Sequence, residues 1–83
     1  MSRVAFDIPA EIAFQLGADD RQAGIALRMM AAVKLFELGR LSAGAAAALA
    51  GVPQPLFLAR LADYGVAALD LSADELAHDL ANA

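Results

Sequence analysis

Few side chains in this sequence have the type and spacing that catalysis requires. The chain of 83 residues contains one histidine, His78, and no cysteine. His78 lies on a predicted acidic helix, where a solvated residue is more common than a base or a ligand. The neighbouring carboxylates Asp74, Glu75 and Asp79 do not follow the spacing of a calcium loop. Because no nucleophile triad, phosphate loop or dinucleotide fingerprint is present, we expect no enzyme and no metal or cofactor.

Side chains suited to DNA contact lie around a helix-turn-helix that we predict between Ser42 and Gly65. Gln54 can pair with an adenine edge, and Arg40 and Arg60 can reach phosphates, which set register but not sequence. The candidate DNA-binding residues are Arg40, Ser42, Gln54, Pro55 and Arg60. Cationic groups supply most of the affinity for DNA, so one copy would bind weakly and a homodimer is expected.

The helix-turn-helix prediction depends on spacing. The motif needs a small residue where its helices cross, a turn glycine with positive φ, an apolar plug and apolar anchors on the second helix. These requirements are met, in that order, by Ala47, Gly51, Val52, and the pair Phe57 and Leu61. Ser42 is placed to cap the first helix, and the second should run from about Gln54 to Tyr64. A helical hairpin without a ligand is the alternative, since alanine-rich sequences meet small-residue requirements easily.

The remaining elements must support this unit. Residues Val4–Ile8 alternate as a half-buried strand would, and such a strand must pair within the chain or across a dimer. A short helix should follow Pro9 and end at Gly17 as a C′ residue. The next helix should start at Asp19 and Asp20 and close at Gly39.

That longest helix carries an apolar stripe of Ile25, Met29, Val33 and Phe36, which Leu27, Met30 and Leu35 widen. We expect it to be buried on more than one side. The predicted fold class is therefore mainly α: a helix-turn-helix core with a short N-terminal β-strand and an acidic C-terminal strand or helix tail.

The charge distribution divides the chain into a body, residues 1–65, and a tail, residues 66–83. The net charge is −4, but residues 1–62 carry six basic and five acidic side chains, whereas residues 63–83 carry five acidic and no basic ones. Ser72 and Glu75 have capping-box spacing ahead of a short helix that must dock to be stable. The candidate partner-binding residues are Leu69, Asp70, Leu71, Asp74, Glu75, Leu76, Asp79 and Leu80. The alternative is that these leucines fold back on the chain's own core.

An uncharged run from Leu41 to Ala59 approaches the length of a membrane span. Glycines, prolines and Gln54 interrupt it, and alanine is only weakly hydrophobic, so two packed helices and a turn are favoured. The absence of cysteine fits a reducing cytoplasm, and no signal peptide is expected. We therefore expect a cytoplasmic protein.

At this point the chain resembles a small prokaryotic family of uncharacterised helix-turn-helix proteins, of the UPF0175 type. The resemblance covers the run Ala31–Ser42, then Ala46, Ala47 and Leu49–Val52, and later Phe57, Leu58, Leu61, Tyr64–Val66, Asp70, Glu75, Leu76 and Asp79. Members often lie beside genes for PIN-domain ribonucleases, which implies an antitoxin that binds such a toxin. This chain differs in having Pro53-Gln54-Pro55 where a polar or basic pair often opens the recognition helix, and Phe36 where tyrosine is frequent.

The resemblance implies two partners: a PIN-type ribonuclease toxin for the tail, and operator DNA for the helix-turn-helix of a dimer. Because the tail has no lysine or arginine, we expect its carboxylates to cover the basic rim where RNA lies, while its leucines fill grooves. The alternative function is a structural protein–protein interaction module whose helix-turn-helix does not bind DNA.

Overall fold

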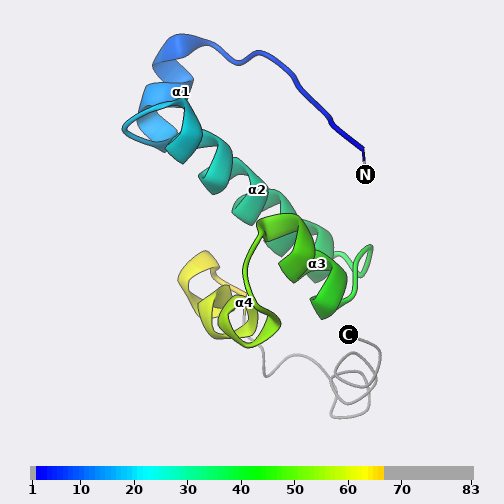
Figure 1. The fold of residues 1–83 in the computed structure, drawn as a ribbon. Coiled ribbons are helices and arrows are strands. Elements are labelled where there is room, and N and C mark those ends of the chain that lie inside the picture. The colour runs from blue at the N-terminus through cyan, green and yellow to red at the C-terminus, as the bar shows by residue number, and fades with distance from the viewer. Residues whose placement is uncertain (1, 67–83) are drawn as a thin grey trace.

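Four α-helices and one 3₁₀ helix follow one another in the computed structural model, which describes residues 2–66 (Figure 1). They are α1 (Ala10–Leu16), α2 (Asp20–Glu37), α3 (Ala43–Ala50), α4 (Gln54–Arg60) and η1 (Leu61–Tyr64). The described part is thus mainly α, as the sequence predicts. The acidic tail that we predict over residues 66–83 lies outside the described residues except for Val66.

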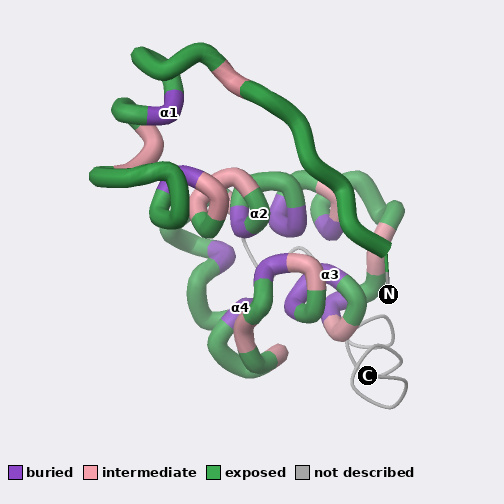
Figure 2. The backbone as a smooth tube through the Cα atoms, turned by 45° about the horizontal axis from the view of Figure 1, so that its top comes forward, coloured by how far each residue is buried: buried purple, intermediate pink, exposed green. Residues whose placement is uncertain are grey.

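The predicted strand over residues 4–8 is not formed. Residues 2–9 have no helix or strand assignment and run away from α1 as an extended arm (Figure 1). Val4 is 82% exposed and Phe6 is 71% exposed, and most of the arm is drawn as exposed in Figure 2. The physical reason is that a strand needs a partner for its backbone groups, and residues 2–66 contain no second strand.

The junction of α1 and α2 is tight. Helix α2 begins at Asp20, as predicted, and the Asp19 carboxylate caps it by accepting a hydrogen bond of 2.8 Å from the Gln22 backbone N–H. Gly17 ends α1, but its φ of −168° is extended rather than left-handed, which corrects the predicted C′ role. A Cβ at Gly17 would lie 2.5 Å from the Ala23 nitrogen. This glycine is therefore required by the close approach of α2.

Helix α2 is the central helix, on which α1, α3 and η1 pack, while α4 packs on α3 and η1 (Figure 1). Its apolar stripe is buried at Met29, Val33 and Phe36, whereas Ile25 is exposed. Met30 is exposed as well, whereas Leu27 and Leu35 are half-buried, so the predicted widening of the stripe is confirmed only in part. The helix ends before Gly39, whose φ of +75° fits the predicted role of a closing glycine.

Alanines form the contact between α2 and α3. Ser42 caps α3 by accepting a hydrogen bond of 3.2 Å from the Ala45 backbone N–H, as predicted. Buried positions of α3 are all alanine, namely Ala43, Ala46, Ala47 and Ala50. Such small side chains let two helix backbones approach closely, which lets a sequence with few large apolar residues still form a packed interface.

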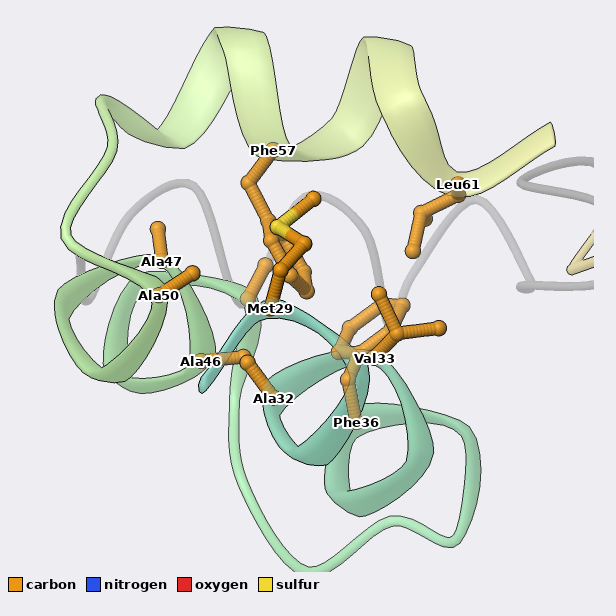
Figure 3. Close-up of a cluster of buried hydrophobic side chains, with 10 residues drawn as sticks. Met29, Ala32, Val33, Phe36, Ala46, Ala47, Ala50, Phe57 and Leu61 are labelled. Carbon is orange, nitrogen blue, oxygen red and sulfur yellow. The ribbon is translucent and has the colours of Figure 1, made fainter. Parts of the chain in front are cut away.

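Three large side chains from different elements complete the core (Figure 3). Phe57 of α4 and Leu61 of η1 have no exposed surface, and both belong to the same cluster as Ala47. The ring of Phe57 meets that of Phe36 edge-on, with centroids 5.7 Å apart and planes at 85°, a favourable geometry for aromatic pairs. The predicted anchoring of α4 by Phe57 and Leu61 is confirmed.

The long uncharged run folds as two helices. Among residues 2–66, no single helix has the length and hydropathy to cross a bilayer. Residues Ala43–Ala50 and Gln54–Tyr64 reach that length only together, and they are bent by 91° at the break between them.

Candidate nucleic-acid interface

The reversal at Gly51 produces the helix-turn-helix geometry. Gly51 has φ +75° and ψ +27°, a left-handed conformation that costs glycine little. Its N–H donates to the Ala48 carbonyl at 3.2 Å, and the Val52 N–H donates to the Ala47 carbonyl at 3.1 Å. The axes on either side then differ by 91°, within the usual range for this motif. The predicted turn glycine and helix crossing are confirmed.

An arginine from α2 fixes the end of α3. The Arg28 Nε donates a hydrogen bond of 2.8 Å to the Leu49 carbonyl, one of the last carbonyls of α3, which have no partner within the helix. Its guanidinium also lies beside Gly51, 3.7 Å from where a Cβ would stand. A cation here also interacts favourably with the negative end of the helix dipole. Sequence reasoning missed this role because the two residues are 21 positions apart and no local pattern joins them.

Prolines define the start of α4. Pro53 has an extended backbone and serves as the N-cap residue, and Pro55 occupies the first turn, where the missing N–H costs no intrahelical bond. The first hydrogen bond of the helix joins the Phe57 N–H to the Pro53 carbonyl at 3.0 Å. The two prolines thus form the start of α4.

The outer face of α4, defined here as Pro55, Leu56, Ala59 and Arg60, is exposed. Phe57 and Leu61 are buried, and the intervening half-buried positions are Gln54 and Leu58. Of the DNA-binding candidates on α4, Pro55 and Arg60 are therefore exposed, whereas Gln54 is half-buried. The spacing contained the correct signal, because Gln54 is three residues before Phe57 and one turn of helix brings them to the same side.

Gln54 is therefore turned toward the protein. Its Nε2 atom is buried and has no hydrogen-bond partner. A buried amide nitrogen without a partner carries a desolvation cost of about 1–3 kcal/mol. In this conformation its Nε2 is not presented at the outer face of α4, where a base edge would be met.

The other DNA-binding candidates come from two segments. Arg40 is exposed in the loop between α2 and α3, and Ser42 follows it with its hydroxyl engaged in the cap of α3. Arg60 closes α4 on the outer face. The arrangement can supply phosphate contacts from Arg40 and Arg60.

A hollow of about 130 Å³ lies at the junction of α1 and α2, lined mainly by Ala10, Ala13, Phe14 and Gly17. Its polar groups are Asp19, which caps α2, and Asp20. Among residues 2–66, no three acidic or histidine side chains are grouped as a metal site would require.

The candidate partner-binding residues, Leu69 to Leu80, and His78 all lie outside the described residues. Comparison with curated proteins gives no match, and comparison with solved structures gives none either. The resemblance noted in the sequence, in contrast, extends over the entire chain. The model of the uncharacterised protein family UPF0175 matches residues 1–83, and the chain therefore belongs to that family.

Proposed function

We propose that this protein is an antitoxin-like module that binds operator DNA through α3 and α4 as a dimer and a PIN-type ribonuclease through its C-terminal tail. The observation that carries the DNA half is the α3–Gly51–α4 geometry, which leaves the outer face of α4 free of the protein's own core. A second helix exposed in this way is the element that enters the major groove in helix-turn-helix proteins.

The nearly neutral charge of the body limits the affinity with which one copy can bind DNA. The body carries only one more basic than acidic side chain over residues 1–62, whereas phosphate neutralisation supplies most of the affinity for DNA. Two copies on one site double the contacts of Arg40 and Arg60. A dimer is therefore part of the proposal.

The experiment for DNA binding is a fluorescence titration of the full chain against the duplex upstream of its own reading frame, with a scrambled duplex of equal length. We expect Arg60→Ala and Arg40→Ala to weaken binding and to lower the salt dependence by about one counterion for each arginine removed. Arg21→Ala is the matched control, because Arg21 is exposed on α2 outside the unit. Equal affinity for both duplexes, or no change in the arginine variants, would contradict sequence-directed binding by this face.

The proposed binding of a toxin is supported by the amino-acid composition of the C-terminal segment. Residues 63–83 combine five carboxylates with leucines and no cation, so this segment suits a basic, grooved protein surface such as the RNA-binding rim of a ribonuclease. Co-purification of the full chain with the product of the neighbouring gene tests it. Deletion of residues 67–83 should abolish that complex and leave the melting temperature unchanged. A lower melting temperature with the complex intact would show that the tail covers the body instead.

One observation favours a second function, an interaction module that does not bind DNA. The outer face of α4 offers one hydrogen-bonding side chain, Arg60, because Gln54 is turned inward. Under this alternative the exposed Leu56 would contact a protein. Unchanged DNA affinity in a Gln54→Ala and Arg60→Ala double variant, together with loss of a protein complex in Leu56→Ser, would favour it.

A further inference from the structure

The N-terminal arm, residues 2–9, has the composition of a strand and no partner within residues 2–66. Val4, Phe6 and Ile8 alternate with Arg3, Ala5 and Asp7, so an extended arm would carry apolar side chains on one face and charged or small ones on the other. Val4 and Phe6 are among the most exposed large apolar side chains of the described chain. An extended segment with unpaired backbone groups and an exposed apolar face invites pairing with another chain.

We infer that this arm pairs antiparallel with the same arm of a second copy, with Ala5 on the two-fold axis. In this register Val4 lies opposite Phe6 of the other copy, and Arg3 lies opposite its Asp7. Neither Arg3 nor Asp7 forms an ion pair within residues 2–66. The pairing therefore gives each of these charges an opposite charge directly across the ladder, twice in each dimer, and such cross-strand pairs are stabilising.

Charge complementarity selects this register over its neighbour. A two-fold axis at Phe6 would place Asp7 opposite Ala5 and Arg3 opposite Pro9, which leaves both charges without a partner. Pro9 lacks a backbone N–H, so it also suits the position just beyond the paired segment. The self-complementary contact, in which residue i meets j and j meets i, is the form that a two-fold dimer requires.

The apolar face of the paired arms can pack against exposed apolar side chains of α1. Two strands alone are marginally stable in water, but α1 follows the arm directly and exposes Ile12 and Phe14. Phe14 is 79% exposed on a helix whose only buried residue is Ala13. Packing of the two-stranded ribbon on the side of α1 that carries Phe14 would bury Phe14 together with Val4 and Phe6.

The inference deepens the proposed function, which requires two copies on one operator, but it is tested without DNA or toxin. Sedimentation of the full chain should show a dimer. Arg3→Asp and Asp7→Arg should each weaken it roughly tenfold or more, because two attractive pairs become repulsive. An equimolar mixture of the two variants should recover the dimer, since one chain is then acidic at both positions 3 and 7 and the other is basic at both. Arg21→Asp, with the same charge change on α2, should leave dimerisation unchanged.

The register can be tested by disulfide cross-linking of introduced cysteines, because the chain contains no cysteine of its own. Ala5→Cys should form a disulfide-linked dimer far faster than Ser2→Cys, whose partner across the ladder is Ile8 rather than its own copy. Monomeric wild-type chain would overturn the inference. A dimer insensitive to both charge changes, with equal cross-linking at both cysteines, would also overturn it while leaving the dimer of the proposed function intact elsewhere in the chain.

Discussion

Gly17 and Gly24 show how the surroundings of a residue decide its effect on stability. A Cβ at Gly17 would meet backbone atoms of Gln22 and Ala23 at 2.7 and 2.5 Å, and packed backbone cannot move at low cost. Gly24 lies inside α2, where nothing stands within 4 Å of an added Cβ. The same change, glycine to alanine, should therefore have opposite signs at two positions seven residues apart.

We expect Gly17→Ala to lower the free energy of unfolding by about 1–3 kcal/mol through overpacking. Gly24→Ala should raise it by about 0.5–1 kcal/mol through helix propensity. Urea unfolding followed by circular dichroism measures both. A loss of stability in both variants, or in neither, would contradict the close approach of α2 to Gly17.

Arg28 acts on a helix far from it in the sequence. Replacing it by methionine keeps most of the aliphatic stem but removes the hydrogen bond to the Leu49 carbonyl. Because the bond is exposed to solvent, we expect a loss of about 1 kcal/mol. Arg21→Met on the same helix is the control and should change the free energy of unfolding by less than about 0.5 kcal/mol. Equal effects of the two substitutions would exclude a specific role for Arg28.

At the scale of elements, the turn between α3 and α4 is the part on which the interface depends. Helices α3 and α4 have eight and seven residues, too few to persist alone in water. Their stability comes from the alanine contact with α2 and from Phe57 and Leu61. The angle between them is set by one left-handed residue, Gly51, and by the prolines that follow.

Gly51→Ala should destabilise the protein by about 1–2 kcal/mol, because alanine is strained at φ +75°. The space at that position is open enough for a Cβ, with the nearest atom, from Arg28, at 3.7 Å. The loss is therefore conformational rather than steric, and Gly51→Asn should lose less because asparagine tolerates this region better. Thermal unfolding of the two variants measures the difference. If asparagine were as costly as alanine, the left-handed conformation would not be the cause.

At the scale of the molecule, the central cluster of residues 2–66 contains few large side chains. Five of the ten buried residues of this cluster are alanine, which contributes little buried area, so Phe57 carries a large share. Phe57→Ala should lower the free energy of unfolding by about 3–5 kcal/mol, a large part of the total stability of a small domain. Leu56→Ala, on the exposed side of the same helix, is the control and should change the free energy of unfolding much less. Urea unfolding followed by circular dichroism checks both, and an equal loss of stability in the two variants would contradict this division of the core.

The sequence predicted those parts of the fold that depend on local rules. The local patterns predicted the start of α2 at Asp19 and Asp20, the cap Ser42, the glycines Gly39 and Gly51, and the anchors Phe57 and Leu61, and each is confirmed. The inward turn of Gln54 was missed although its helical spacing to Phe57 indicates it. Arg28 and Gly17 act through contacts between elements, which a single sequence does not encode as a pattern. The extended arm has the alternation of a strand but lacks a partner within residues 2–66.

Helix α1 contributes nothing to the central cluster of buried side chains, and Ala13 is its one buried residue. Its local opening is therefore separate from global unfolding, so its amides should exchange with solvent hydrogen far sooner than those of α3. A milder core change such as Phe57→Leu should accelerate exchange in α3 without altering the rate in α1. The amino-terminal end can thus unfold and refold, or change partners, while the end formed by α3 and α4 keeps its shape.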